Sequence, residues 1–234
     1  MGRLLFDPAL RDRTYVFRDR AAAGRKLAAL VREHVPRPFH LFAIPAGGVP
    51  VAAEIARDLA LPLDLVIVRK IQLPWTTEAG FGALDPEGRA LLNQDLVRRV
   101  NLSPQQIETQ TAKTLAGLRE REARFRQGRP YPDLAGGAAL VVDDGLASGY
   151  TMRAAVRFLR EKGAGRLVVA VPTALERTAR ELLPRVDLLV CPNLRGGLSF
   201  AVADAYENWY DVEEAEVLAI LAALAPAPGG ERHP

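Results

Sequence analysis

Short apolar runs alternate with amphipathic segments along most of the chain. Each run is almost wholly apolar, which is the pattern of a strand that is buried on both faces of a sheet. The predicted strands are 39–44, 63–68, 138–142, 167–171 and 186–190. Because strands that alternate with helices build a parallel sheet with helices on its faces, we expect an α/β protein.

The segments between the strands carry the features of helices. Helices are expected over 20–34, about 49–59, 103–126, about 150–162, 173–183 and 211–224. Three pairs of residues have the spacing of N-terminal caps, in which side chains satisfy free backbone groups of the first turn: Ser103 with Gln106, Thr173 with Glu176, and Asp211 with Glu214.

The alternation breaks between residues 71 and 100. The first ten residues of this stretch contain Pro74 and Trp75 without a period, and we predict an irregular loop. The sequence Asp85-Pro86-Glu87-Gly88 suits a type I hairpin turn, because Pro stands second and Gly fourth. We interpret this stretch as a hairpin insertion and candidate lid. The predicted organisation is a core over 1–190 that includes the insertion 71–100, a hood segment at 191–210, and a C-terminal helix and tail at 211–234.

Composition narrows the class of protein. Hydrophobic residues make up 49% of the 234 residues and charged residues 25%, which suits a chain that buries its own core. The 31 basic and 28 acidic residues give a net charge of +3 and are interspersed, so we expect no dedicated nucleic-acid surface. Cys191 is the single cysteine, and no apolar stretch has the length of a membrane helix. We expect a cytoplasmic protein that does not bind membranes.

Unusual residues follow three of the predicted strands. Ala46-Gly47-Gly48 follows the first strand, Arg69-Lys70 the second, and the segment from Asp143 to Thr151 the third. In an open parallel sheet, ligands bind at the carboxyl ends of the strands, where the chain order changes direction. The three segments are therefore candidates for one site.

The third of these segments carries the most specific chemistry. Its small residues let backbone N–H groups converge on an anion, and the N-terminus of the following helix adds partial positive charge. The hydroxyl groups of Ser148 and Thr151 add donors, whereas Asp143 and Asp144 stand one step away as acceptors for vicinal sugar hydroxyls. A phosphate cradle beside diol acceptors predicts a site for a ribose 5-phosphate.

Simpler interpretations of the three segments stay open at this stage. They are an ordinary strand-to-helix turn capped by acids, a plain glycine turn, and a pair of solvated cations. Two other functions are excluded: a nucleoside triphosphate P-loop, because Tyr150 stands where its lysine would be, and a serine hydrolase, because the pattern is not Gly-x-Ser-x-Gly.

The residues from Leu140 to Thr151, Leu-Val-Val-Asp-Asp-Gly-Leu-Ala-Ser-Gly-Tyr-Thr, resemble the signature with which type I phosphoribosyltransferases bind phosphoribosyl pyrophosphate (PRPP). The similarity extends over about 39–210, because the order of strands, the interrupting loop and the terminal hood also fit. The resemblance implies a Rossmann-like core of mostly parallel sheet flanked by helices, with a flexible-loop hairpin and a small C-terminal hood.

The resemblance also implies roles for individual residues. Asp143 and Asp144 would be catalytic and would hold the 3- and 2-hydroxyls of the ribose. The 5-phosphate would lie on Gly145, Leu146, Ala147, Ser148, Gly149, Tyr150 and Thr151. Pyrophosphate would meet Ala46, Gly47 and Gly48, with a cis peptide bond between Ala46 and Gly47, and the basic pair Arg69 and Lys70. Within the hood, Phe200, Tyr206, Trp209 and Tyr210 are candidates to stack on a planar base.

The reaction that this resemblance implies is displacement at C1 of the ribose, with diphosphate leaving and a nucleobase or similar nitrogen acceptor entering. Mg²⁺ would be bound mainly by PRPP and water, with Asp143 and Asp144 reaching it through water. Ala147 stands where 6-oxopurine enzymes carry an aspartate, which argues against hypoxanthine and guanine. Ala46 stands where many relatives carry Arg or Lys, so one cation for diphosphate is missing.

Two other functions remain possible on the same residues. One is a regulator with this fold that binds PRPP or a nucleotide together with nucleic acid and does not catalyse transfer. The other is a hydrolase of PRPP or a sugar phosphate. By analogy with the fold, a homodimer is expected.

Overall fold

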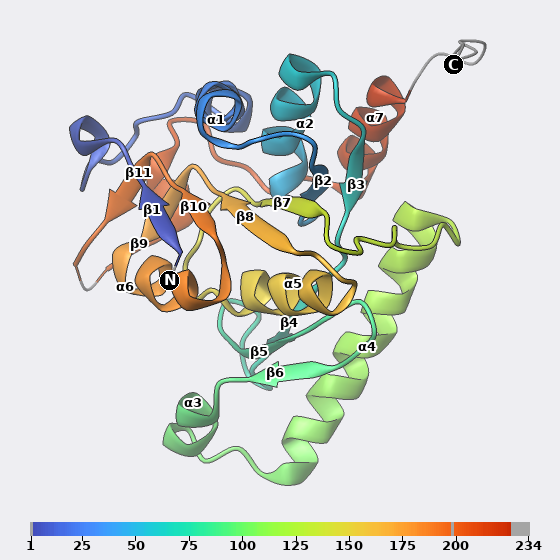
Figure 1. The fold of residues 1–234 in the computed structure, drawn as a ribbon. Helices are drawn as coiled ribbons and strands as arrows, with labels where there is room; N and C mark the ends of the chain where they lie inside the picture. Colours follow the sequence, from blue (N-terminus) through green and yellow to red (C-terminus); the bar gives the residue numbers. More distant parts are fainter. Residues whose placement is uncertain (1, 198, 226–234) are drawn as a thin grey trace.

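A parallel β-sheet forms the centre of the molecule (Figure 1). The computed structural model describes residues 2–197 and 199–225. Within them, the central sheet has the order β1-β10-β8-β7-β2-β3, and every neighbouring pair of strands is parallel. The strands are β1 (Arg3–Leu5), β2 (His40–Ala43), β3 (Leu63–Leu65), β7 (Ala138–Val142), β8 (Arg166–Ala170) and β10 (Leu188–Val190). The predicted fold class is confirmed.

Helices cover both faces of this sheet, as Figure 1 shows. One face carries α1 (Arg20–His34), α2 (Gly48–Leu59) and α7 (Glu214–Leu224), and the other carries α5 (Tyr150–Glu161) and α6 (Glu176–Leu182). Because successive side chains of a strand point to opposite faces, Leu41 packs into the core beneath α1 and α2, whereas Phe42 packs against α5. The sheet therefore has a separate apolar core on each side.

The insertion forms a second, antiparallel sheet beside α5. Its strands are β4 (Arg69–Gln72), β5 (Gly80–Leu84) and β6 (Ala90–Leu92), and it continues into α3 (Gln94–Arg99) and the long α4 (Pro104–Arg126). Ser103 and Gln106 form the predicted capping box at the start of α4. The predicted turn is also confirmed, because Gly88 N donates to Asp85 O at 2.8 Å.

The second core strand is shorter than predicted. β3 ends at Leu65, and the backbone N–H of Ile67 donates to the Tyr131 hydroxyl at 3.2 Å instead of a strand ladder. Arg69 and Lys70 therefore open the antiparallel hairpin and do not end a core strand. The predicted irregular loop 71–80 is partly strand, and only 73–79 connect β4 to β5.

Two predicted helix caps are wrong. Thr173 lies in strand β9 (Thr173–Leu175) and its hydroxyl donates to Asn193 Oδ1 at 2.6 Å, so it does not cap α6. The N-cap residue of α7 is Glu213 rather than Asp211. Both residues have the spacing of a cap. Thr173 instead pairs in a sheet, and α7 begins two residues later than the spacing from Asp211 suggests.

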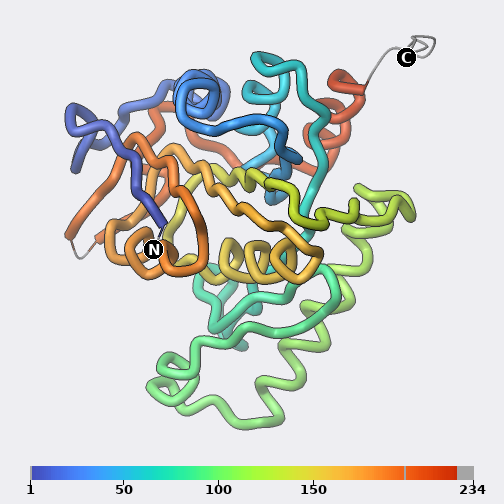
Figure 2. The backbone as a smooth tube through the Cα atoms, in the orientation of Figure 1, coloured from blue at the N-terminus to red at the C-terminus, as the bar shows by residue number. Residues whose placement is uncertain are grey.

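The hood contains more of the chain than the predicted 191–210. β9 pairs in parallel with β11 (Asn193–Arg195), so part of the predicted core joins it. The N-terminal segment runs beside the hood in Figure 2, and Phe17 forms a β-bridge with Tyr206. Three short 3₁₀ helices complete the described elements: Pro8–Leu10, Leu183–Arg185 and Val202–Ala205.

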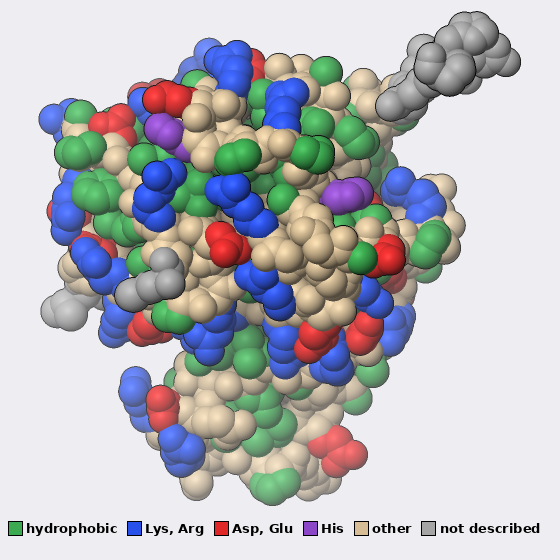
Figure 3. Space-filling model, in the orientation of Figure 1, with side chains coloured by type: hydrophobic (Ala, Val, Ile, Leu, Met, Phe, Trp, Pro, Cys, Tyr) green, Lys and Arg blue, Asp and Glu red, His purple; other side chains and the backbone are tan. Residues whose placement is uncertain are grey.

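The charges on the surface and the hydropathy of the helices both follow the pattern of the sequence. On the face in Figure 3, basic and acidic side chains are interspersed over the main body and the hairpin lobe. None of the helices in the described residues is long and apolar enough to cross a membrane.

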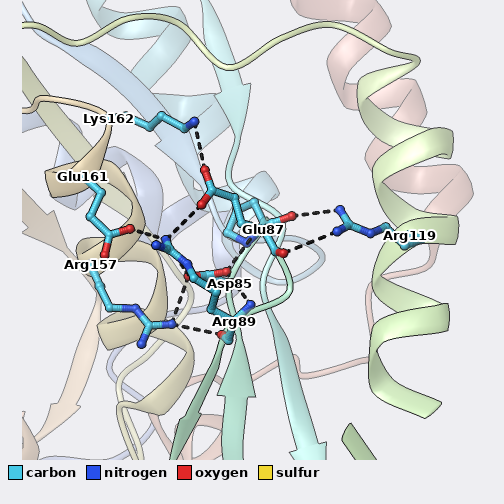
Figure 4. Close-up of polar contacts among 8 residues, drawn as sticks. Asp85, Glu87, Arg89, Arg119, Arg157, Glu161 and Lys162 are labelled. Atoms are coloured by element: carbon cyan, nitrogen blue, oxygen red, sulfur yellow. Dashed lines mark hydrogen bonds and ion pairs between the residues drawn. The ribbon is translucent and has the colours of Figure 1, made fainter. Parts of the chain in front are cut away.

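The turn between β5 and β6 is fastened to two helices (Figure 4). The Asp85 carboxylate is fully buried and accepts hydrogen bonds from Arg89 Nε and from Arg157 Nη2 of α5, each at 2.9 Å. From the other side, Arg119 of α4 donates to the carbonyl oxygens of Pro86 at 3.1 Å and Glu87 at 3.4 Å. This end of the insertion is therefore held by side chains of both α5 and α4.

Replacing Asp85 with Ala is expected to lower the free energy of unfolding by about 2–4 kcal/mol, because two guanidinium groups lose their buried partner. Asp95→Ala is the matched control: its carboxylate is 81% exposed, and its ion pair with Arg98 should be worth less than about 1 kcal/mol. Urea denaturation followed by circular dichroism measures both. Equal losses would show that the turn is not held by Asp85.

Candidate active site

Two loops meet at the point of the sheet where the chain stops adding strands on one side of β2 and continues on the other. β3 lies on one side of β2 and β7 on the other, so the carboxyl ends of β2 and β7 mark the switch point. Ala43 at the end of β2 is level with Val142 at the end of β7. The segments 45–48 and 143–151 therefore begin side by side, as the sequence predicted.

Asp143 and Asp144 form a close pair of partly buried carboxylates after β7. The backbone N–H of Asp144 donates to Asp143 Oδ1 at 2.9 Å. Burial raises the pKa of the Asp143 carboxyl well above its usual value, and the neighbouring Asp144 charge raises it further. Burial also raises the pKa of Asp144, although Arg20 opposes this effect. The ionised pair is thus short of hydrogen-bond donors, and a ligand that brings hydroxyl groups would supply them.

The loop after β2 approaches these acids closely. A Cβ atom on Gly47 would lie 2.0 Å from Asp144 Oδ2, and one on Gly48 would lie 2.9 Å from the Asp143 Cα. Gly48 faces backbone atoms that cannot give way, whereas a side chain at Gly47 would have to displace the Asp144 carboxylate. The loop contains a cis peptide bond, but it joins Pro45 to Ala46. The prediction of a cis bond between Ala46 and Gly47 is therefore wrong by one residue: the cis bond precedes Ala46.

The segment after Asp144 is anchored to the hood. Leu146 is buried, its N–H donates to Thr173 O at 2.9 Å, and its carbonyl oxygen accepts from Leu175 N at 2.9 Å. A Cβ atom on Gly145 would lie 2.4 Å from a methyl group of Val202. The hood thus sets the position of the loop.

The remainder of this loop leaves donors free. Among the described residues, the backbone N–H groups of Ala147, Ser148 and Gly149 donate to no protein acceptor. Gly149 has φ +78°, a conformation that favours glycine, and it leads directly into α5. Tyr150 and Thr151 occupy the first turn, whose N–H groups have no partner within the helix. Such a set of N–H groups at a helix N-terminus is suited to bind an anion.

Arg20 is a site residue that the sequence analysis missed. It lies at the start of α1, is 4% exposed, and donates from Nε to Asp144 Oδ2 at 2.9 Å. Its position in the first turn of a helix was one available indication, because the helix dipole disfavours a cation there. Contact over 124 residues of sequence could not be read from a local pattern.

Among the aromatic residues of the hood, Tyr206, Trp209 and Tyr210 lie beside Asp144 or Arg20, whereas Phe200 lines a cavity. Tyr206 is 1% exposed and its hydroxyl donates to the Asp144 carbonyl oxygen at 2.6 Å, so its ring has no free face for a base. The Trp209 ring lies 4.0 Å from the Arg20 guanidinium, and the Tyr210 ring lies 5.4 Å from it. Phe200 is partly exposed and lines a cavity, so of the predicted stacking residues it is the best placed.

Arg69 and Lys70 make separate contacts. The Arg69 guanidinium packs on α4, where a Cβ atom on Gly117 would lie 2.3 Å from it, and burial lowers its pKa. Lys70 Nζ donates to Glu78 O at 2.6 Å and thereby closes the loop 73–79. Neighbouring residues of a strand point to opposite faces, so the two side chains leave β4 in different directions. Their role in binding pyrophosphate stays a prediction.

A cavity of about 520 Å³ opens beside the free N–H groups. It lies between Ala147 and Ser148 of the loop after β7, Arg177 of α6, Arg99 of α3 and Phe200 of the hood. In Figure 3, the left side of the surface is indented between the main body and the lobe that carries α3. A planar ligand that enters here would reach the loop from the side of the hood.

Comparison with known proteins agrees with this geometry. A sequence profile described as "Phosphoribosyl transferase domain" matches residues 17–207. Since the match covers most of the chain, the protein belongs to the phosphoribosyltransferase family.

Two curated proteins and one solved structure are similar to this chain over most of its length. Two Mycobacterium tuberculosis proteins, from strains CDC 1551 / Oshkosh and ATCC 25618 / H37Rv, each carry the name "Putative phosphoribosyl transferase" and are 37% identical over 206 residues, or 88% of this chain. The chain spans about half of their length (46%). The crystal structure of TT1426 from Thermus thermophilus matches with a TM-score of 0.69 and 34% identity, over 90% of this chain and 99% of that chain.

Proposed function

We propose that this protein transfers the ribose 5-phosphate group of PRPP to a nitrogen of a nucleobase or similar heterocycle and releases diphosphate. One observation carries the proposal: two carboxylates, Asp143 and Asp144, stand beside a loop whose backbone N–H groups are free. The carboxylates can accept hydrogen bonds from vicinal hydroxyls, while the N–H groups can cradle a phosphate.

The roles of the chain's own groups follow from this arrangement. The acids would orient the ribose and stabilise the positive charge that develops at C1 as diphosphate leaves. The N–H groups of 147–151 would hold the 5-phosphate and so fix the sugar relative to the acceptor. The glycine loop 46–48 lies against the same acids, and its backbone is expected to face the diphosphate.

The residues present suit a Mg²⁺ ion that is held mostly by substrate. In the part of the chain that the structure describes, no three His, Cys, Asp or Glu side chains are grouped as a metal site. Mg²⁺ commonly binds through substrate phosphates and water with one or two carboxylates, and Asp143 and Asp144 are the carboxylates available. The ion would neutralise charge on the departing diphosphate.

The acceptor is expected in the cavity between the phosphate loop and Phe200. Ala147 lines this cavity and has no group that can transfer a proton. This supports an acceptor other than a 6-oxopurine.

The proposal predicts diphosphate release from PRPP that depends on both Mg²⁺ and an acceptor. The test incubates the protein with labelled PRPP, Mg²⁺ and a panel of bases that includes adenine, orotate, uracil, hypoxanthine and guanine, and separates the labelled nucleotide product. Chelation of Mg²⁺ should reduce the rate to background.

Three results would contradict the proposal in different ways. Diphosphate release that needs no acceptor would indicate a hydrolase. Uptake of PRPP without turnover, together with salt-sensitive retention of RNA or DNA, would indicate a regulator. Absence of any PRPP uptake by calorimetry would show that the paired acids and the loop serve another ligand.

A further inference from the structure

Arg20 makes three kinds of contact at once. Its Nε and Nη2 both lie 2.9 Å from Asp144 Oδ2, and its Nη1 donates to the carbonyl oxygen of Tyr210 at 2.8 Å. The guanidinium also lies over the Trp209 ring at 4.0 Å. The Arg20 side chain is buried, so these contacts form largely away from solvent. One residue of α1 therefore joins the acid pair to the hood.

The contacts commit one oxygen of each acid. Asp144 Oδ2 is taken by Arg20, and Asp143 Oδ1 accepts from the Asp144 backbone. Among the described residues, no N–H donates to Asp144 Oδ1 or to Asp143 Oδ2. Two vicinal hydroxyls need two acceptor oxygens, and these two oxygens accept no N–H from the described residues.

We propose that Arg20 is a positioning residue: it turns the Asp144 carboxylate so that Oδ1 faces the sugar, and it links the occupied sugar site to Trp209. The inference rests on the proposed function, since the sugar is that of PRPP. Arg20 touches neither sugar nor phosphate and acts through Asp144.

The contacts require an arginine rather than any cation. A planar guanidinium can donate from two nitrogens to one carboxylate oxygen, donate from its third nitrogen to a carbonyl oxygen, and stack on an indole. A lysine ammonium at the same position could keep the charge but not all three contacts. Arg20→Lys should therefore retain part of the effect, and Arg20→Gln should lose it.

A double-mutant cycle tests the inference on PRPP affinity, measured by calorimetry with Mg²⁺. Arg20→Gln should weaken binding by roughly tenfold to a hundredfold, the usual range for a lost charge-assisted contact. In the Asp144→Asn background, the same substitution should change binding less than about twofold, because its route is already absent. Arg32→Gln is the control: this α1 side chain is 60% exposed, pairs with Asp58, and should leave affinity unchanged.

The fluorescence emission of Trp209 provides a second measurement. It would not respond to PRPP if Arg20 only stabilised the fold. The chain has two tryptophans, and Trp75→Phe leaves Trp209 as the reporter. Addition of PRPP and Mg²⁺ should shift its emission with Arg20 present, shift it less in Arg20→Lys, and not at all in Arg20→Gln. Thermal unfolding verifies that each variant is folded, and Arg20→Lys serves alone if Arg20→Gln does not fold.

The outcomes separate the two proposals. Independent, multiplicative losses from Arg20→Gln and Asp144→Asn, or an Arg20→Lys variant equal to wild type in affinity and emission, would overturn the role of Arg20. In both cases wild-type uptake of PRPP persists. Wild-type protein that takes up no PRPP would overturn the proposed function and, with it, the sugar-positioning role.

Discussion

Replacing both acids, Asp143→Asn with Asp144→Asn, is expected to abolish phosphoribosyl transfer while the protein stays folded. Removing one preorganised electrostatic group from an active site costs about 10²–10³ in kcat, and two charges are lost here, so we expect kcat/KM to fall by at least about a thousandfold. Asparagine matches aspartate in size, so neither substitution adds a clash or leaves a cavity, and the fold is expected to persist. Unchanged turnover would remove the acids from the mechanism.

The stability of this double variant has a predictable sign. The pKa of each carboxyl is raised above its usual 3.8 by burial, so the folded protein binds these protons more tightly than the unfolded chain. The ionised pair consequently costs stability as the pH rises above about 3.8, and the cost persists at neutral pH. Urea denaturation measures the free energy of unfolding at pH 5 and pH 8. It should fall less between these two pH values in the variant than in wild type. A steeper decline would show that the ionised pair stabilises the loops.

Gly47→Ala is expected to inactivate the protein although no chemical group is removed. The new methyl group would lie 2.0 Å from Asp144 Oδ2 and 2.6 Å from its Cγ, so the carboxylate must move. A displacement of about 1 Å at a reacting centre costs roughly a hundredfold in rate. We therefore expect kcat/KM with PRPP to fall by about a hundredfold or more.

Gly128→Ala is the matched control for this substitution. Gly128 has φ +76° and nothing within 4 Å of an added Cβ, and it follows α4 rather than β2 or β7. Its replacement should cost about 1 kcal/mol of stability through backbone strain and leave kcat/KM unchanged. If both variants lost activity in proportion to stability, the close approach of Gly47 to Asp144 would not be the cause.

The parts of the site that are contiguous in sequence could be predicted. The acids and the loop from Gly145 to Thr151 lie between one strand and one helix, so local periodicity places them at a strand end and a helix start. The glycine loop after β2 was predicted for the same reason. The roles of these residues remain proposals, although the structure brings the segments together.

Other features depended on pairing between distant segments. Thr173 has the spacing of a cap, but its strand pairs with β11 and its hydroxyl meets Asn193. The three residues of β1 are too few to show a period and become a strand only beside β10. Arg69 and Lys70 lie in an antiparallel strand rather than at the end of a core strand, because β4 pairs with β5, a partner that the residues next to them do not reveal.

The sequence by itself determined the α/β class, the switch-point loops and the acid pair, because each depends on residues within a few positions of one another. Only the tertiary structure placed Arg20 on Asp144 and against the Trp209 ring, fastened the insertion to α5 through Asp85, and buried Tyr206. These contacts join residues that are far apart in the chain, and no local periodicity records which distant side chain a buried charge will meet.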